Sequence, residues 1–421
     1  MDKNIIMEYM RKANPWWSES FAKINLEYKE REIYAEVAKR MRLRMIIALT
    51  GLRRVGKTTL MMKLISQRID EGFDKKKIIY FSFDDFSEMR LMELLDLYGE
   101  ILEKIEADKD YLIVFDEIQK VKDWSNQLKV LYDLYPKIKF IISGSESLFI
   151  KKKSKESLAG RIFEFKINPL NFAEFLKFKE VNIKNIFIQK DSILSNFRQF
   201  LITNGFPEII DYNEEDIRKY IKEGIIDKII YSDFVQVFEI RNTDIIKSIF
   251  DIIYNDPGQI IEIQELSKEL GISRGILSNY LEYLQEAFLI KKLYNYSKNA
   301  RKTQRRLKKF YPALVNPLLI KDNFGKVFEQ FVANQLDAEY FWRDSFKNEV
   351  DIIKLDPLTA IEIKSGEIKL KDLVSLKQFI KKYKPKNAFV ISFNVEKEIE
   401  GIKVIPFYKY LIELGKPKSS Q

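Results

Sequence analysis

Short apolar runs alternate with amphipathic stretches through the first 175 residues. The runs cover residues 45–50, 78–83, 112–116 and 140–143, and the segments between them carry a helical spacing of apolar positions. Strands that are apolar at nearly every position are typical of parallel sheets, which are buried on both faces. We therefore predict an N-terminal helical segment at 1–30 and an α/β core with a parallel sheet at 31–175.

The rest of the chain changes pattern three times. Residues 176–242 are spaced as helices with a break at 205–208, which indicates a helical lid or connector. Residues 243–315 contain a helix, a Gly-Ile-Ser turn, a second helix and a strand, the order of a winged helix-turn-helix. From 316 to 421 the order helix, strand, strand, helix, strand predicts a small separate α/β domain.

Composition narrows the possible chemistry. The 421 residues include no Cys and no His, which excludes disulfides, the usual zinc clusters and histidine acid–base catalysis. The formal net charge of +10 gives a mild attraction for polyanions, although Lys-rich and Glu-rich chains are also typical of heat-adapted proteins. No apolar stretch suits a secretory segment or a membrane span, so we expect a cytoplasmic protein with no membrane partner.

A glycine-containing loop follows the first apolar run and opens a helix. Its residues are Gly51, Leu52, Arg53, Arg54, Val55, Gly56, Lys57, Thr58 and Thr59. Backbone N–H groups of such a loop cradle the β-phosphate of a nucleotide, and the helix dipole assists them. Lys57 is expected to reach the β- and γ-phosphates, Thr58 to ligate Mg²⁺ and Thr59 to start the helix. The motif predicts ATP and Mg²⁺ as cofactors.

Two carboxylates end the run at 112–116, at the ligand edge of the predicted sheet. Asp116 is expected to hold the hydrated Mg²⁺, and Glu117 to orient and polarise the attacking water. A helix cap after a core strand is the other interpretation of this pair. Ser143 or Ser145, after the next run, is a candidate sensor of the γ-phosphate or part of a simple turn.

Several segments resemble one family, the archaeal and bacterial AAA-type P-loop ATPases that carry a poorly characterised C-terminal domain. The similar segments are GLRRVGKTT, LIVFDEIQ, FIISGSES, LAGR, PLNFAEFL and GFPE, at 51–59, 112–119, 140–147, 158–161, 169–176 and 205–208. The resemblance implies a RecA-like or AAA-like core. It also implies that Arg161, in LAGR, acts on the γ-phosphate in cis or across a subunit boundary of a homo-oligomer. A surface arginine is the alternative.

Polar residues of the C-terminal segment form a second constellation. Glu329 shares a largely apolar helix face and needs a partner there. Asp351 lies in a Val- and Ile-rich strand, and period two places Glu362 and Lys364 on one face of the next strand. Two adjacent strands with carboxylates can hold a divalent cation, while Lys364 positions water or a phosphate.

The order helix Glu, strand Asp, then Glu-x-Lys resembles the PD-(D/E)XK nuclease superfamily. That resemblance implies Mg²⁺ or Mn²⁺ at Glu329, Asp351 and Glu362. It further implies cleavage of phosphodiesters by Asp351, Glu362 and Lys364. Ordinary salt bridges across strands are one alternative, and a nuclease-like fold retained for docking is another.

DNA is the expected partner. Arg274, Ser278 and Asn279 are predicted on the exposed face of a recognition helix at 273–285. The apolar positions expected to face inward are Ile276, Leu277, Leu281 and Leu284. Such modules also serve as protein connectors. The basic run at 301–309, with Tyr296 and Tyr311 nearby, and the run at 151–155 suit phosphate contact or are solvated loops.

The sequence as a whole predicts an ATPase that couples hydrolysis to DNA binding or processing. One alternative is an ATP-dependent regulatory switch or docking ATPase with a catalytically silent C-terminal domain. Another is a DNA-binding module that hydrolyses ATP only as a timer. Salt-sensitive stimulation of the ATPase by DNA favours the first hypothesis, and indifference to DNA favours the switch.

Overall fold

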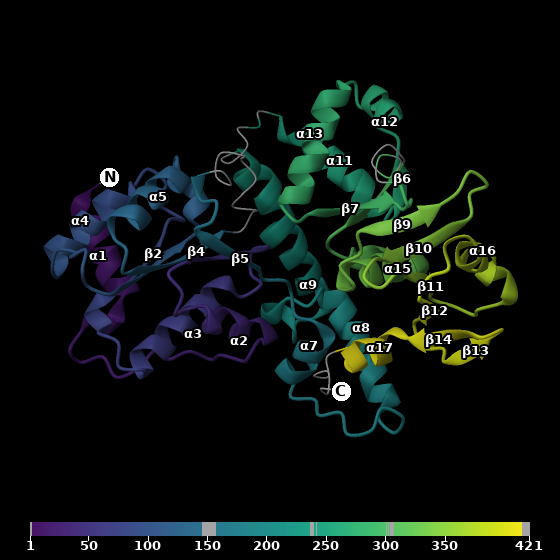
Figure 1. Ribbon diagram of the computed structural model, residues 1–421, viewed down its shortest axis with the longest axis horizontal. Coiled ribbons are helices and arrows are strands. Elements are labelled where there is room, and N and C mark those ends of the chain that lie inside the picture. Colours follow the sequence, from purple (N-terminus) through teal and green to yellow (C-terminus); the bar gives the residue numbers. More distant parts are fainter. Residues whose placement is uncertain are drawn as a thin grey trace. The chain divides into compact units, whose positions relative to one another are not determined.

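The computed structural model describes residues 2–144, 157–235, 240, 242–299, 301, 303 and 307–414. The chain divides into two compact units, Met1–Pro169 and Leu170–Gln421, and Figure 1 labels most of their helices and strands. Among the helices described, none combines the length and the apolar character needed to cross a bilayer.

The sheet of the first unit has five parallel strands in the order β2-β3-β4-β1-β5. The strands are β1 (Ile46–Thr50), β2 (Ile78–Ser82), β3 (Tyr111–Asp116), β4 (Ile138–Gly144) and β5 (Ile162–Lys166). The first four confirm the predicted runs, and β4 lies between β1 and β3. The sequence pattern misses β5 because this edge strand is only partly buried, with Phe165 as its one buried residue.

Five α-helices lie among the described residues of the first unit. They are α1 (Lys3–Ala13), α2 (Glu32–Lys39), α3 (Lys57–Asp70), α4 (Leu91–Ile101) and α5 (Trp124–Leu134). The segment after α1 covers the edge strand β2, because the Asn14 side chain donates to the Tyr80 carbonyl at 2.9 Å and accepts from the Tyr80 N–H at 2.6 Å. An uncovered edge would present unpaired backbone groups. The N-terminal segment is therefore part of the first unit and protects the β2 edge of its sheet.

The second unit contains one nine-stranded sheet in the order β13-β14-β12-β11-β10-β9-β7-β8-β6. The strands are β6 (Gln259–Ile261), β7 (Ile290–Asn295), β8 (Lys308–Pro312), β9 (Tyr340–Arg343), β10 (Glu349–Lys354), β11 (Thr359–Lys364), β12 (Asn387–Ser392), β13 (Lys397–Ile399) and β14 (Ile402–Pro406). Strand β7 pairs in parallel with β9 through Tyr294 and Tyr340. The sheet thus continues across the predicted domain border at 315/316.

The helices of the second unit fall on both sides of that border. They are α7 (Phe172–Phe178), α8 (Lys190–Thr203), α9 (Glu214–Ile221), α11 (Thr243–Asn255), α12 (Ile263–Glu269), α13 (Arg274–Glu286), α15 (Phe324–Gln335), α16 (Val374–Tyr383) and α17 (Phe407–Leu414), with π-helical turns at Lys222–Asp227 and Ile229–Asp233. Phe197 of α8 lies 5.9 Å from Phe331 and 6.0 Å from Phe407, between ring centroids. Part of the predicted lid is therefore core of the second unit.

Candidate nucleotide site and C-terminal carboxylate cluster

Two positions in the loop after β1 have a backbone conformation that favours glycine. Gly51 has φ of +144°, and an added Cβ would lie 2.2 Å from the Ile167 carbonyl oxygen. Gly56 has φ of +96° and directly precedes α3. Glycine tolerates such conformations and such close approaches at no steric cost. The two glycines therefore fix the loop between strand and helix as the motif predicts.

Lys57 is buried inside this loop. Its ammonium donates to the carbonyls of Gly51 at 3.0 Å and Leu52 at 2.8 Å. Arg31, which the sequence analysis does not identify, supports the loop from outside by donating to the Val55 carbonyl at 3.0 Å. These contacts hold a cation at the centre of the loop, where phosphate oxygens of a nucleotide would lie.

Asp116, at the end of β3, is held by three hydroxyl groups. Thr58 donates to Oδ2 at 2.7 Å, Tyr80 donates to Oδ2 at 3.0 Å, and Ser143 donates to Oδ1. Burial, followed by the charge of Glu117, raises the pKa of Asp116 despite these donors. Ser143 is thereby placed as a partner of Asp116, and Tyr80 is a site residue that the sequence analysis misses.

Glu117 lies beside this network in an unusual backbone conformation. Its φ of +54° is in the left-handed region, which non-glycine residues enter rarely. Its N–H donates to Asp116 Oδ1 at 3.1 Å and to Ser143 Oγ at 3.2 Å. Its carboxylate accepts from Gln119 Nε2 at 2.6 Å. The backbone turn and Gln119 together set the direction of the Glu117 side chain.

This donor set fits Mg-ATP. The Thr58 hydroxyl and the Asp116 carboxylate are hard oxygen ligands in direct contact, and Lys57 supplies a positive charge next to them. Leu52 and Val55 are buried, whereas Arg54 and Thr59 are exposed and Arg53 is half-buried. Helix α3 begins at Lys57, so the prediction that Thr59 starts it is wrong.

Arg161 is not brought to the nucleotide loop of its own chain. Its carbonyl accepts from the N–H of Ile46, at the start of β1, whereas the loop follows the opposite end of that strand. Its guanidinium pairs with Asp133 at 3.2 Å. Of the two alternatives, action in cis and action across a subunit boundary, this arrangement does not support the first. Ser145 lies outside the described residues.

A buried lysine lies at the centre of the C-terminal carboxylates. Lys309, on β8, is 4% exposed, and its ammonium is 2.6 Å from Glu329 Oε1 and 2.6 Å from Glu349 Oε1. Asp351 Oδ1 lies 3.9 Å away. Tyr311 also donates to Glu329 Oε1, at 2.5 Å. Glu329 thus has the partner that its apolar helix face requires.

The charges of this cluster shift each other's ionisation. Burial alone would raise the pKa of Glu329, but Lys309 and the hydrogen bond from Tyr311 outweigh it and lower that pKa. Burial and then the charge of Glu362 raise the pKa of Asp351 well above its usual range. Lys309 is therefore an ammonium ion in a buried site that contains more acid than base.

Asp351 and Glu362 form the second half of the cluster, on β10 and β11. Asp351 Oδ2 accepts from the Ile363 N–H at 2.8 Å, and Lys364 donates to Glu362 Oε1 at 2.7 Å. Glu362 Oε2 is buried and has no hydrogen-bond partner among the described residues. Burial raises the pKa of Glu362 to about 7, so this carboxyl group gains or loses its proton as the pH passes through neutrality.

These carboxylates do not fit a divalent cation as they stand. The Lys309 ammonium takes the position between Glu329 and Asp351 that a shared cation would need. In the part of the chain that the structure describes, no group of three or more Asp or Glu side chains is arranged to hold a metal. The predicted Mg²⁺ or Mn²⁺ site at Glu329, Asp351 and Glu362 is therefore not supported by this geometry.

The helix-turn-helix candidate is partly as expected. Helix α13 exposes Arg274, Ser278 and Asn279 and buries Leu277, Leu281 and Leu284. Ile276 is 43% exposed, so the prediction that it faces inward is wrong.

The basic run contributes less surface than expected. Lys309 and Tyr311 are buried and cannot contact a phosphate backbone, which corrects that interpretation for both residues. Of the other expected contacts, Arg301 is exposed. Lys302, Arg305, Arg306 and residues 151–155 lie outside the described residues.

Comparisons with known proteins also separate the N-terminal part of the chain from the rest. Residues 43–176 match a family model described as an AAA domain. Residues 194–315 and 324–410 each match a domain of unknown function. The first match contains the nucleotide loop, Asp116 and Glu117, and it supports an AAA-type ATPase domain.

Similar proteins include an uncharacterized protein of Methanocaldococcus jannaschii, 37% identical over 59% of this chain. The match spans 56% of that relative's own length. An uncharacterized protein of Haemophilus influenzae is 26% identical over 87% of this chain and 94% of its own. Among solved structures, a Walker-type ATPase of Pyrococcus abyssi is 15% identical with a TM-score of 0.41, over 66% of this chain and 94% of that one.

Proposed function

We propose that the first unit binds and hydrolyses Mg-ATP through Lys57, Thr58, Asp116 and Glu117. The observation that carries this proposal is the 2.7 Å hydrogen bond from Thr58 to Asp116. It joins the two halves of a magnesium site, from separate motifs, at one edge of the sheet. The AAA-domain match over residues 43–176 supports the same assignment.

Each side chain has a role that its contacts support. Mg²⁺, when bound, neutralises phosphate charge. When the nucleotide binds, the Lys57 ammonium exchanges the carbonyls of its loop for phosphate oxygens. Asp116 then gives up hydrogen bonds from hydroxyl groups, which carry no charge. Glu117, oriented by Gln119 at 2.6 Å, accepts a proton from the attacking water.

Steady-state ATPase assays test this proposal with two variants. Glu117→Gln removes the base but keeps the shape of the site, so we expect kcat to fall by about 10²–10⁴-fold with nucleotide affinity retained. Lys57→Ala is expected to weaken nucleotide binding itself. Arg90→Ala, an exposed position at the start of α4, serves as the control. Full ATPase activity in Glu117→Gln would refute the assigned role.

We further propose that hydrolysis is coupled to DNA binding in the cytoplasm. The exposed Arg274, Ser278 and Asn279 of α13 support this idea, because they form a polar surface on a helix of the kind that enters a major groove. DNA should stimulate the ATPase, and added salt should weaken that stimulation. Arg274→Ala should reduce it without changing the basal rate. Indifference to DNA would favour the regulatory switch.

Arg161 keeps one possible role in this scheme, on the nucleotide of a neighbouring copy in a homo-oligomer. ATPase activity per chain would then rise with protein concentration, and Arg161→Ala would abolish that rise. A concentration-independent rate that Arg161→Ala leaves unchanged would leave Arg161 as a surface residue paired with Asp133.

The position of Lys309 favours a second candidate function for the C-terminal part, a nuclease-like fold used for docking rather than cleavage. An internal ammonium already balances Glu329 and Glu349 at 2.6 Å each. We therefore expect no cleavage of labelled single-stranded, duplex or branched DNA with Mg²⁺ or Mn²⁺. Metal-dependent cleavage that Asp351→Ala abolishes would establish an ATPase-nuclease instead.

A further inference from the structure

A cavity of the first unit lies at the edge of the sheet opposite the nucleotide loop. Its volume is about 450 Å³. Three segments at the amino ends of strands line the cavity. They are residues 41–44 before β1, 110–112 at the start of β3 and 136–139 at the start of β4. The amino ends of parallel strands share one edge, so the cavity lies roughly 15 Å from the loop that follows β1. It is distinct from the ATP site.

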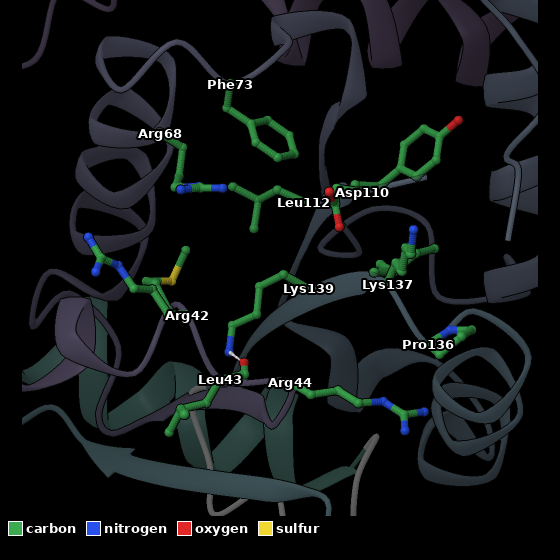
Figure 2. A pocket seen from close by; sticks show the side chains of 13 residues that line it. Arg42, Leu43, Arg44, Arg68, Phe73, Asp110, Leu112, Pro136, Lys137 and Lys139 are labelled. Carbon is green, nitrogen blue, oxygen red and sulfur yellow. Dashed lines mark hydrogen bonds between the residues drawn. The ribbon is translucent and has the colours of Figure 1, made fainter. Parts of the chain in front are cut away.

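Positive charge dominates this cavity, as Figure 2 shows. The cationic lining residues are Arg42, Arg44, Arg68, Lys137 and Lys139, against one carboxylate, Asp110. Arg68 pairs with Glu71 at 2.8 Å. Arg42 and Lys137 are exposed. Neither forms an ion pair within 4.0 Å of a carboxylate among the described residues, although the charge of Arg42 contributes to lowering the pKa of Glu71. Most of the lining cations thus lack a carboxylate partner within the described chain.

Two of these cations are fixed by uncharged groups. The Lys139 ammonium donates to the carbonyls of Leu43 at 2.8 Å and Met45 at 2.5 Å. Burial lowers the pKa of Lys139 to about 8. Arg44 donates to the Tyr132 carbonyl at 3.0 Å and stacks over the Tyr132 ring at 4.4 Å. These contacts position the cations without neutralising them, and a bound anion would supply the missing charge.

Apolar side chains complete the lining. Phe73 lies on one wall, with Arg68 stacked 4.7 Å from its ring, and Leu112 lies near it in Figure 2. Cavities of roughly 300–1,000 Å³ suit small molecules. Cations beside an aromatic face suit a phosphate chain attached to a base.

We propose that this cavity binds a ligand with several phosphate groups, as a site separate from the ATP site. The ligand is a free polyphosphate compound such as a nucleotide, or the backbone of a single-stranded nucleic acid. The two sources present the same phosphate chemistry to Arg42, Lys137 and Arg44. The proposal does not rest on ATP hydrolysis, because none of the lining residues belongs to the nucleotide loop.

Binding measurements on the full chain test this site while Mg²⁺ and a non-hydrolysable ATP analogue saturate the nucleotide loop. The probes are inorganic tripolyphosphate, followed by calorimetry, and a fluorescent oligo-dT of roughly 12 nucleotides, followed by anisotropy. The test variant is Arg42→Ala/Lys137→Ala. The control is Lys23→Ala/Lys104→Ala, which removes the same charge from exposed positions outside the cavity. Melting curves should show that both variants fold.

We expect the test variant to lose about tenfold or more in affinity and the control to bind as wild type does. For the oligonucleotide, a single strand, the slope of log K against log salt should become shallower by about 1.4, or roughly 0.7 for each cation removed. If the test variant loses affinity for both probes, the ligand is a nucleic-acid backbone. If it loses affinity for tripolyphosphate alone, the ligand is a free polyphosphate. Wild type that binds neither probe, or a test variant that binds both as tightly as wild type, would overturn the proposal.

Discussion

The two buried carboxylate sites of this protein are held in opposite ways. Asp116 accepts hydrogen bonds from the neutral hydroxyls of Thr58 and Tyr80 at 2.7 and 3.0 Å. Glu329, in the second unit, is paired with the Lys309 ammonium at 2.6 Å. Burial raises the pKa of Asp116, whereas Lys309 outweighs burial and lowers the pKa of Glu329. Asp116 is thus bonded directly to neutral hydroxyls, whereas Glu329 is bonded directly to a cation.

This difference indicates which site can accept a cation. A hydroxyl donor can turn its proton away and offer its oxygen to a metal, so Asp116 and Thr58 can become ligands together. An ammonium cannot do so, and a divalent cation next to it would meet like charge. The carboxylates that a motif identifies are therefore insufficient to predict a metal site, because the neighbouring cation decides whether the metal fits.

The largest effect is expected from removing the built-in cation. Lys309→Met removes the buried counter-charge of Glu329 and leaves Glu349 paired only with the half-buried Arg343, and breaking such a buried pair costs about 3–5 kcal/mol. The free energy of unfolding, measured with urea at pH 7, should fall by that amount. Mn²⁺ at millimolar concentration should restore part of it, since the vacated position then accepts a cation.

Lys308→Met provides the matched control for this experiment. Lys308 neighbours Lys309 on β8 but is half-buried, so its loss should change the unfolding free energy by less than about 1 kcal/mol. Equal destabilisation by the two substitutions would contradict the special role of Lys309.

A smaller effect concerns the pH dependence of stability. Burial raises the pKa of Glu362 from 4.5 to about 7 in the folded protein. Between these values the folded state binds more protons than the unfolded state, so stability should fall as pH rises, by on the order of 1 kcal/mol per pH unit. Glu362→Gln should remove the part of the slope between pH 5 and 7 that Glu362 contributes, and Asp351 should contribute a slope of the same sign. Glu367→Gln, an exposed neighbour, should retain it, and an unchanged slope in Glu362→Gln would refute the assignment.

The smallest effect on stability is expected at the nucleotide site. Asp116→Asn replaces a buried acid whose ionisation burial disfavours, and its hydroxyl partners can bond an amide equally well. The unfolding free energy at pH 7 should change by less than about 1 kcal/mol, while ATPase activity is lost. Thermal unfolding and ATPase assays on the same sample check the expected stability and the expected loss of activity. A large loss of stability would show that Asp116, like Glu329, has a structural role.

The nucleotide site is predictable from sequence because its parts are local. The loop from Gly51 to Thr58 is one continuous motif, and Asp116 ends an apolar strand, so both are recognisable without tertiary contacts. Arg31 and Tyr80 are missed because they reach the site only through folding, from segments with no motif. Strand β5 is missed because partial burial weakens its apolar pattern.

The C-terminal cluster shows where sequence reasoning stops. Glu329, Asp351 and Glu362 are recognised as a group, and the expectation that Glu329 needs a partner is confirmed by Lys309 and Tyr311. Lys309 itself is interpreted as part of a basic run that suits phosphate contact or forms a solvated loop, because its charged neighbours hide a strand in which alternate side chains turn inward. Only the tertiary fold of the second unit brings Lys309 to these carboxylates.

Counting bound Mn²⁺ by electron paramagnetic resonance tests the central claim most directly. With a saturating non-hydrolysable ATP analogue, wild type should bind one Mn²⁺ per chain, at Thr58 and Asp116, and Lys309→Met should bind a second. A second Mn²⁺ in wild type that Asp351→Ala removes would contradict the claim that Lys309 takes the place of a metal.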